Sequence, residues 1–437
     1  MRVLVVGSGG REHAIVRALS RSSPAPDLLC APGNAGICAE ARCLEVGASD
    51  VEAIVAAARE EHVELVVIGP EAPLVEGLAD ALEEAGIPAF GPSREAARIE
   101  GSKVHAKELM REAGVPTASH VVLRDREEAS AHLACASYPA VLKADGLAAG
   151  KGVLICENER EARAAIEVLF VERRFGETSV VLEEHLEGEE LSLLALCDGE
   201  NVVPLAPAQD YKRIHDDDRG PNTGGMGSYS PVPGFDAAEA EWIADAVHRP
   251  IVELLRGRET PYHGVLYAGL MLTTAGPKVL EFNCRFGDPE TQAVLPRMRN
   301  DLLELCLAAR EPGGLAGMEA AFSPDWAVTV VLASAGYPAS SSKGDVIRGL
   351  DAVPAGIELT HAGTARRDGE IVTAGGRVLN VTGLGGTAAE ARERAYEAAR
   401  MIEFDGKQMR TDIAARAVER AAAVQDAREG AATGGGA

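Results

Sequence analysis

The sequence predicts a chain of several domains that begins with a doubly wound parallel α/β unit and continues in α+β units. In the first hundred residues, short apolar runs alternate with helical stretches, which is the pattern of strands joined by crossover helices. Farther along, strand-like runs are separated by glycine-rich loops. The length of 437 residues and the hydrophobic content of 46% allow two to four domains with sizeable cores.

The composition predicts which classes of partner the protein binds and in which cellular compartment it lies. A net charge of −24 argues against nucleic acid or an anionic membrane as a partner, because both attract clustered Lys and Arg. The eight cysteines form no Cys-x-x-Cys pair and no zinc-type spacing, so we expect reduced, buried thiols. We find no signal-peptide pattern and no apolar run of membrane-spanning length, so we expect a cytoplasmic protein. The Ala- and Gly-rich residues 421–437 predict a flexible tail.

The N-terminal region, residues 1–100, carries the doubly wound pattern. Strands are expected at 3–6, 28–30 and 65–68, and helices at 12–20, 50–61 and 74–85. Ligands of such sheets bind beyond the carboxyl ends of the strands. The loops at that edge are 7–12, 32–34 and 69–71.

The first of these loops predicts an anion site and disfavours a dinucleotide site. A Gly-x-Gly-x-x-Gly motif would need glycine where Glu12 stands, and the second strand ends in Cys30-Ala31-Pro32 without an acidic residue for a cofactor ribose. A glycine turn at a helix N-terminus still attracts negative charge, so we expect a phosphate-bearing small molecule there. A tight turn without a ligand explains this loop equally well.

From residue 101 the pattern suggests phosphate contacts. Residues 102–113 read as a helix carrying Lys103 and Lys107, and a strand from Pro139 ends near Lys143. The loop that follows, 146–152, is no Walker motif, because three residues separate its first glycines and Gly152 follows the lysine. It can close over a nucleotide's phosphates, although a plain hairpin loop is the alternative.

Two strands joined by an acidic linker, 180–183 and 191–196, resemble a hinge. Backbone groups of such a hinge can bind an adenine edge, and Glu190 can accept from ribose hydroxyls. A merely solvated acidic turn is the commoner meaning of such a run.

The stretch from Lys278 to Glu290 is the one around which the chain is organised. Because strand side chains alternate, Glu281 and Asn283 are expected on one face, with the apolar Leu280 and Phe282 on the other. A carboxylate and an amide oxygen suit magnesium, and Arg285 just beyond suits a carboxylate or phosphate. The alternative is an edge strand whose glutamate faces solvent.

Two further segments could help to close the site. The long loop 209–231 is polar and glycine-rich, and we expect it to cover a substrate and to be disordered when empty. The region after residue 324 predicts strands at 327–334, 357–362 and 378–382 and a helix at 387–402. Its glycine turns, 361–364 and 374–377, lie where they could approach the site, but a structural role is favoured for them.

The order of these parts resembles the ATP-grasp superfamily, whose members clamp ATP between two α+β subdomains. The motifs GSGGREH (7–13), KADGLAAGKG (143–152), GPNTGGMG (220–227) and RFGDPE (285–290) resemble the phosphoribosylamine-glycine ligase family from residue 1 to about 420. The resemblance implies that ATP phosphorylates glycine and that 5-phosphoribosylamine attacks the glycyl phosphate.

The resemblance also implies domain bounds and site residues. The implied division is 1–100 for 5-phosphoribosylamine, 101–323 for the ATP-grasp domain with 118–189 as its mobile lid, and 324–420 as a small C-terminal domain. The implied catalytic residues are Lys143, Arg285 and Asp288, of which Asp288 would hold the glycine ammonium. The implied ATP ligands are Lys103, Lys143, Gly146, Gly150, Lys151, Gly152, Glu183, Glu184, Leu186 and Glu190. The implied substrate ligands are Gly9, Gly10, Arg11, Asn34, Asp210, Lys212, Asn222, Thr223, Gly224, Gly225, Arg285 and Asp288.

Glu281 and Asn283 would hold Mg²⁺ or Mn²⁺. The strand at 265–273, which supplies a further acidic ligand in many ATP-grasp enzymes, has no carboxylate here, so the metal shell is incompletely specified. We expect a monomer whose partners are small molecules. Three alternatives stay open at this point: another ATP-dependent carboxylate–amine ligase or carboxylase, a dinucleotide-dependent oxidoreductase, and a binding protein without catalysis.

Overall fold

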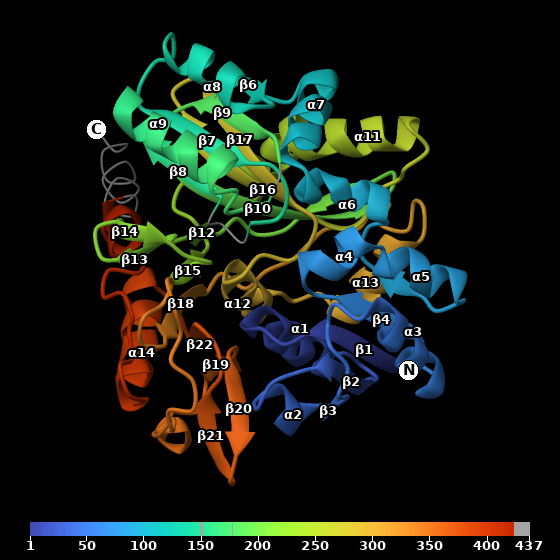
Figure 1. Cartoon of the computed structure of the whole chain (residues 1–437). Coiled ribbons are helices and arrows are strands. Elements are labelled where there is room, and N and C mark those ends of the chain that lie inside the picture. Colours follow the sequence, from blue (N-terminus) through green and yellow to red (C-terminus); the bar gives the residue numbers. More distant parts are fainter. Residues whose placement is uncertain (149–151, 177, 424–437) are drawn as a thin grey trace, which may run out of the picture.

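The computed structural model describes residues 1–148, 152–176 and 178–423. Figure 1 shows four regions arranged around the short helix α12 (Glu290–Val294), with the N-terminal region at lower right and the C-terminal region at lower left. The lid region and the central sheet lie above them. Among the described residues, no helix combines the length and the apolar character needed to span a bilayer.

The N-terminal region is a five-stranded parallel sheet in the order β3-β2-β1-β4-β5, as the sequence predicts. The strands are β1 (Arg2–Gly7), β2 (Asp27–Pro32), β3 (Arg42–Cys43), β4 (Leu65–Ile68) and β5 (Ala89–Phe90). The helices are α1 (Gly10–Ser20), α2 (Ile37–Glu40), α3 (Val51–Glu60), α4 (Glu71–Glu76), α5 (Leu78–Glu84) and α6 (Arg94–Gly101). Alternate side chains of β1 enter two different cores, because helices cover both faces of the sheet.

The expected helix at 74–85 is two helices. Gly77 lies between α4 and α5 with a φ of +90°, a conformation that ends a right-handed helix and that glycine adopts without a steric penalty.

The lid region is an antiparallel sheet in the order β6-β9-β7-β8. It consists of β6 (His120–Leu123), α8 (Arg126–Leu133), β7 (Ala140–Ala144), β8 (Val153–Cys156), α9 (Glu159–Ile166), the π-helical turn η1 (Glu167–Val171) and β9 (Val180–Glu184). Its buried side chains form a separate core that runs from Leu123 to Leu182 and takes no residue from another region. A unit with its own core can move as a body.

The central sheet is antiparallel, in the order β11-β10-β16-β17. Its elements are α7 (Lys103–Ala113), β10 (Glu189–Asp198), β11 (Val202–Pro204), α10 (Ala237–Ile243), η2 (Ala244–His248), α11 (Arg249–Gly257), β16 (His263–Thr273), β17 (Gly276–Asn283), η3 (Leu295–Arg297) and α13 (Leu302–Arg310). The predicted acidic linker, 184–190, contains this connection: residues 185–188 join β9 of the lid sheet to β10 of the central sheet. The sequence therefore places the junction of the two sheets correctly.

The C-terminal sheet has the order β12-β15-β18-β22-β19 and includes two strands of the long loop. The elements of the loop are β12 (Gln209–Asp210), β13 (Arg213–His215), β14 (Arg219–Asn222) and β15 (Gly227–Ser230). The others are β18 (Trp326–Ala333), η4 (Leu350–Ala352), β19 (Ile357–His361), β20 (Thr364–Arg367), β21 (Glu370–Thr373), β22 (Arg377–Gly385) and α14 (Ala388–Met401).

The long loop contains four short strands, a regular structure that the sequence analysis did not expect, while its disorder without substrate stays a prediction. Arg410, from the end of the chain, pairs with Asp218 at 2.9 Å and also donates to the carbonyl of Arg213 at 3.1 Å. A carboxylate of the acidic run is therefore paired with an arginine about two hundred residues away in sequence. Residues 421–423 of the expected tail are still helical, and its remainder lies outside the described residues.

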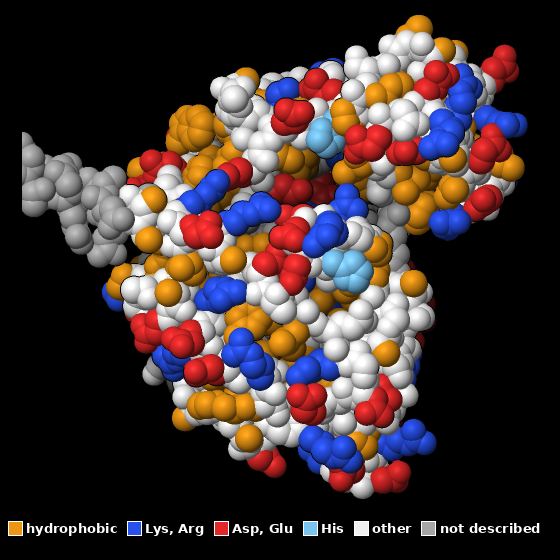
Figure 2. Space-filling view, turned by 90° about the vertical axis from the view of Figure 1, so that its left-hand side faces the viewer, with side chains coloured by type: hydrophobic (Ala, Val, Ile, Leu, Met, Phe, Trp, Pro, Cys, Tyr) orange, Lys and Arg blue, Asp and Glu red, His pale blue; other side chains and the backbone are white. Residues whose placement is uncertain are grey.

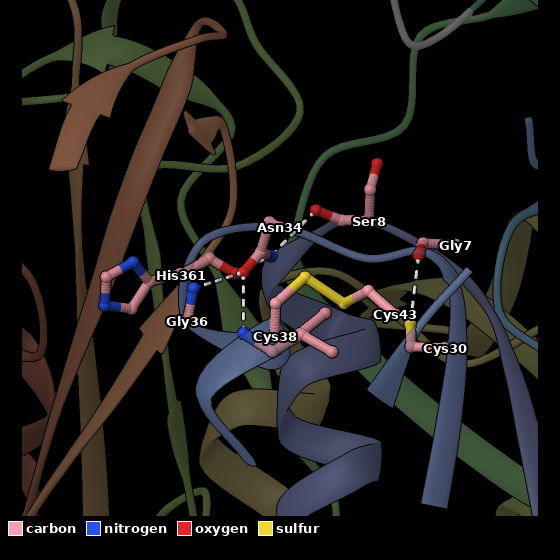
Figure 3. Close-up of a disulfide and its surroundings, with 9 residues drawn as sticks. Gly7, Ser8, Cys30, Asn34, Gly36, Cys38, Cys43 and His361 are labelled. Atoms are coloured by element: carbon pink, nitrogen blue, oxygen red, sulfur yellow. Dashed lines mark hydrogen bonds between the residues drawn. A yellow bond between two sulfur atoms is a disulfide. The ribbon is translucent and has the colours of Figure 1, made fainter. Parts of the chain in front are cut away.

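The expectation of reduced, buried thiols is confirmed for five of the eight cysteines and wrong for the other three. Cys38 and Cys43 form a disulfide, and Cys135 is exposed. The single turn of α2 and the short β3 bring the two Cα atoms within 5.3 Å, which lies in the range that a disulfide needs. Figure 3 shows this disulfide beside Asn34 and His361, at the contact between the N-terminal and C-terminal regions.

Candidate functional site

A cavity of about 300 Å³ lies where all four regions meet. Arg11 and Glu71 line it from the N-terminal region, Lys143 from the lid, Glu281 from the central sheet and Arg377 from the C-terminal region. Figure 2 shows one hollowed face of the molecule, beneath the lobe at upper right, where acidic and basic side chains lie side by side. The cavity thus combines charges of both signs, which suits a charged ligand such as a nucleotide.

The predicted metal strand is β17, and Glu281 faces the cavity from it. Burial by itself would raise the pKa of Glu281, but the positive charges of Lys212, Lys143, Lys103 and Arg285 hold it below its ordinary value. The carboxylate is therefore ionised at neutral pH and surrounded by cations.

One detail of the strand differs from the expected alternation. The register of β16 against β17 shifts between Gly269 and Leu270, so the chain bulges at Leu280. Leu280 consequently lines the cavity, is only partly buried and is absent from the core, whereas Val279 and Phe282 are buried in the core, with Phe282 also bordering the cavity. The expectation that Leu280 shares the buried face with Phe282 is wrong, because a bulge changes which side chains share a face.

Asn283 lies at the end of β17 and is buried. Its Oδ1 accepts a hydrogen bond from Arg285 at 3.0 Å, and its Nδ2 is buried without a hydrogen-bond partner among the described residues. The side chain is thus incompletely satisfied in this arrangement. Two protein oxygens, one carboxylate and one amide, fit magnesium, which keeps most of its shell for water and substrate phosphates. The described residues include no group of three or more His, Cys, Asp or Glu that could hold a metal on its own.

Arg285 is held between the N-terminal region and the central sheet. Its Nε lies 3.2 Å from Glu71 and its Nη2 lies 3.3 Å from Glu100. Burial works against the charged form, yet Glu100 and Glu71 raise the pKa of Arg285 above its ordinary value. Burial of Glu71 would raise its pKa, but the positive charges of Arg285 and Arg11 lower the pKa to about 2. The guanidinium is permanently charged and fixed in orientation.

Lys143, predicted to contact phosphates, emerges from β7 into a buried ion-pair triad. Its Nζ lies 3.0 Å from one oxygen of Glu183, while the Nζ of Lys107 lies 3.0 Å from the other. Lys143 also donates to the carbonyl of Leu280 at 2.9 Å, which joins the lid to β17. Lys103 donates to the carbonyl of Gly146 at 2.8 Å, at the start of the glycine loop. Both predicted phosphate lysines therefore line the cavity, Lys103 from α7 and Lys143 from the lid.

The predicted nucleotide residues are only partly brought together. Gly146, Gly152 and Glu183 line the cavity, whereas Gly150 and Lys151 lie outside the described residues. The Glu184 carboxylate turns away to Lys278, 3.0 Å distant, and Leu186 and Glu190 are not among the described lining residues. The range predicted from the sequence includes both Glu183 and Glu184. It cannot say which of them faces the cavity, because adjacent side chains of a strand point to opposite faces.

A charged cluster that lines the cavity, formed by Asp210, Lys212, Tyr267 and Glu290, was predicted only in part: Asp210 and Lys212 were expected to bind substrate. Burial works against the charge of Lys212, but Asp210, at 3.5 Å, raises its pKa well above the ordinary value. Glu290 accepts from Tyr267 at 2.8 Å and from Ser192 at 3.2 Å. Burial and the charge of Asp210 raise the pKa of Glu290. Nothing in the sequence indicated that Tyr267 and Ser192 take part in the site, because each is an isolated residue in an apolar strand.

The glycine loop after β1 holds a carboxylate of the chain itself. Glu12 accepts from the backbone N–H of Gly9 at 2.6 Å and pairs with Arg11 at 2.6 Å. A Cβ on Gly7 or Gly69 would come within 2.6 Å of Glu12 atoms, so both glycines make room for this side chain. The residue that interrupts the dinucleotide motif thus fills the space between the two turns.

Asn34, predicted to bind substrate, has a structural role through its side chain. Its Nδ2 donates to the carbonyls of Ser8 at 2.9 Å and His361 at 2.7 Å, and its Oδ1 accepts from the N–H groups of Gly36 and Ile37 at 3.0 Å (Figure 3). These bonds occupy both donors of the amide and join the N-terminal to the C-terminal region. Gly9, Gly10 and Asn34 are not among the described residues that line the cavity.

The loop 222–225 reaches the cavity through Thr223 and Gly224, while Asn222 and Gly225 are not among its described lining residues. Asp288 lines the same end and pairs with Arg377 at 2.7 Å. Burial would raise the pKa of Asp288, but Arg377 and Arg11 lower it below the ordinary value. The sequence indicated a glycine turn at 374–377, yet nothing in its local pattern indicated that its arginine reaches Asp288.

Comparison with known proteins accounts for all of these regions. Models of the N, ATP-grasp (A) and C domains of phosphoribosylglycinamide synthetase match residues 1–100, 101–291 and 327–416. The chain belongs to the phosphoribosylglycinamide synthetase family. This confirms the predicted resemblance and fold class, and it identifies the fold of the central and lid regions as ATP-grasp.

Relatives of the phosphoribosylglycinamide synthetase family cover almost the whole chain. A phosphoribosylamine–glycine ligase of Streptomyces coelicolor is 51% identical over 95% of this chain and 99% of its own length. One from Vibrio parahaemolyticus is 46% identical over 96% and 99%.

Solved structures agree with this assignment. The phosphoribosylamine–glycine ligase of Thermotoga maritima superimposes with a TM-score of 0.83 at 37% identity, over 94% of this chain and 100% of that chain. The biotin carboxylase domain of Hydrogenobacter thermophilus 2-oxoglutarate carboxylase, solved with MgADP and bicarbonate, gives 0.70 at 21% identity, over 93% and 91%. The latter likeness concerns the fold alone.

Proposed function

We propose that the chain ligates glycine to 5-phosphoribosylamine with ATP and releases glycinamide ribonucleotide, ADP and phosphate, a step of purine synthesis. The observation that carries the proposal is the cavity of a phosphoribosylglycinamide synthetase family member, in which Lys143 of the lid meets Lys103, Glu281 and Arg285 of the central region. Another carboxylate–amine ligase of the same fold is disfavoured by the ligase relatives at 51% and 46% identity.

The proposed reaction has two steps. A carboxylate oxygen of glycine attacks the terminal phosphorus of ATP, and ADP leaves. The amine nitrogen of 5-phosphoribosylamine then attacks the carbonyl carbon of glycyl phosphate, phosphate leaves, and the nitrogen loses a proton. Charge concentrates on the transferred phosphoryl group, so fixed cations at that point lower the barrier.

The residues present can supply these cations. Lys103 and Lys143 neutralise the phosphates, and Arg285, fixed by Glu71 and Glu100, stabilises the transferred phosphoryl group or the glycine carboxylate. Glu281 and Asn283 would hold magnesium or manganese, which supplies a further positive charge at the phosphates. Asp288, with unused acceptor positions, binds the glycine ammonium. The loop that begins at Gly146 and the hinge that follows β9 enclose the nucleotide.

The domain division also belongs to this proposal. Residues 1–100 would bind 5-phosphoribosylamine, 101–323 ATP, with 118–189 as the lid, and 324–420 would close the site. The separate core of the lid and the family matches at 1–100, 101–291 and 327–416 support it. We further propose a cytoplasmic monomer that acts on small molecules and not on nucleic acid, consistent with the net charge of −24.

The direct test is ADP release with ATP, glycine and freshly made 5-phosphoribosylamine, each omitted in turn. The proposal requires release that depends on all three and a product with the mass of glycinamide ribonucleotide. Release that continues unchanged without glycine or without the amine contradicts it.

A further inference from the structure

Arg377, the first residue of β22, joins two cavity loops from the C-terminal region. Its Nη2 donates to Oδ2 of Asp288 at 2.7 Å, and its Nη1 donates to the Asp288 carbonyl at 2.8 Å and to the Gly224 carbonyl. One guanidinium therefore fixes both the side chain and the backbone of Asp288 and ties them to the loop 222–225.

Close packing around this contact leaves no room for a side chain at the two glycines of that loop. A Cβ on Gly224 would lie 3.1 Å from Cζ of Arg377, and a Cβ on Gly225 would lie 2.4 Å from Cδ of Pro289. Gly225 also has a φ of +106°, which disfavours any side chain. A second residue of the C-terminal region, Tyr337, accepts from the N–H of Gly224 at 3.0 Å. The loop is thus held against the Asp288 turn by close approach as well as by hydrogen bonds.

Asp288 remains able to bind a ligand in this arrangement. One carboxylate oxygen accepts from Arg377 and the other from Gln292 at 2.7 Å. A carboxylate offers about four acceptor positions, so about two remain. Both Asp288 and Arg377 line the cavity, and Thr223 and Gly224 lie at the same end.

We propose that Arg377 is a positioning residue by which the C-terminal region orients Asp288 and the loop 222–225 for the amino-acid substrate. The inference rests on the proposed function, since it takes glycine as the ligand of Asp288. Arg377 acts through Asp288 and Gly224 and is not required to touch the reacting atoms. It follows that removing the guanidinium weakens glycine binding far more than ATP binding.

The test compares Arg377→Ala, Arg377→Lys and the control Arg366→Ala in the full chain. Arg366 lies in the exposed hairpin of β20 and β21, where its side chain donates to the Gly369 carbonyl, away from the cavity. For Arg377→Ala we expect the KM for glycine to rise at least about tenfold, with the KM for ATP within about twofold of wild type. Arg377→Lys should fall between wild type and Arg377→Ala, because an ammonium reaches fewer of the three acceptors. Arg366→Ala should match wild type.

A binding measurement separates this inference from the proposed function. The shift in Tm that glycine produces in the presence of a non-hydrolysable ATP analogue should shrink in Arg377→Ala, while the shift from the analogue alone persists. If Arg377→Ala does not fold, the same comparison is made with Arg377→Gln. A folded variant with an unchanged KM for glycine, or with equal rises in both KM values, overturns the inference. Wild-type protein that fails to turn over glycine would instead overturn the proposed function.

Discussion

Nζ of Lys143 lies 3.0 Å from Oε2 of Glu183, and this contact ties a predicted phosphate-binding lysine to the strand that leads into the hinge. The same carboxylate holds Lys107 of α7, and all three side chains are almost fully buried, with exposed fractions of 7%, 2% and 3% for Lys143, Glu183 and Lys107. Burial lowers the pKa of Lys107. The lid and the central region therefore meet at a buried charge triad next to the cavity.

Removal of Glu183 should destabilise the protein strongly. Glu183→Ala would leave two buried ammonium groups without their carboxylate, a change that costs about 3 kcal/mol or more. Urea unfolding followed by circular dichroism measures the loss. The matched control is Glu187→Ala, in the exposed linker, for which no change beyond about 0.5 kcal/mol is expected. Equal stability of the two variants would show that the triad does not hold the lid.

Glu281→Ala should abolish turnover and leave the fold intact. Glu281 is the carboxylate that four surrounding cations keep ionised, and it is one of the two proposed metal ligands. We expect kcat to fall about 1,000-fold or more, as the loss of several kcal/mol of charge stabilisation implies. The measurement is ADP release at saturating magnesium, with Glu319→Ala, an exposed carboxylate, as the control. Near wild-type activity in Glu281→Ala would remove this residue from the metal site.

Arg285→Lys should lose most activity although it keeps the charge. An ammonium cannot pair with Glu71 and Glu100 and also donate to Asn283, so its position toward the phosphoryl group is lost. We expect kcat to fall about 100-fold, the scale for losing one aligned donor at a transition state. Arg366→Lys serves as the control. A kcat equal to that of wild type would exclude Arg285 from the mechanism.

The disulfide predicts a simple thiol count. Alkylation of the denatured protein without reductant should label six cysteines, and alkylation after reduction should label all eight. Mass spectrometry reads both numbers. In the double variant Cys38→Ser/Cys43→Ser the count should be six under both conditions. Eight labelled thiols in unreduced wild type would show that Cys38 and Cys43 are not paired.

Two buried histidines should make the protein less stable in mild acid. Burial lowers the pKa of His248 and His361 to about 4, from about 6.5 in an unfolded chain. Between these values the unfolded state binds protons that the folded state does not, so stability is fully present above about pH 6.5 and falls as the pH drops toward 4. At pH 5 each histidine costs about 2 kcal/mol.

The corresponding measurement is Tm at pH 7.5 and at pH 5. The decrease should be smaller in His361→Gln and in His248→Gln than in wild type, because a neutral amide takes up no proton. His62→Gln, at an exposed position, should show the wild-type decrease. An unchanged decrease in both buried-site variants would assign the acid sensitivity to other groups.

The sequence by itself determined the features that repeat locally or depend on motif order. The alternation of strands and helices predicted the parallel N-terminal sheet. The acidic run 184–190, which separates two apolar strands, predicted the junction that the structure has at 185–188. The four motifs gave the family, and the charged and amide residues of 278–290 pointed to β17. Apart from the order of the motifs, which spans residues 7 to 290, each of these signals lies within a short stretch of chain.

The tertiary structure alone decided which partners these residues meet. Leu280 faces the cavity because β17 bulges against β16, and Glu12 occupies the glycine loop between Gly7 and Gly69. Arg410 pairs with Asp218 of the long loop, and Asp288 is fixed by Arg377, 89 residues farther along the chain. Contacts between residues so far apart leave no periodicity in the local sequence, so only the packing of the four regions against one another determines them.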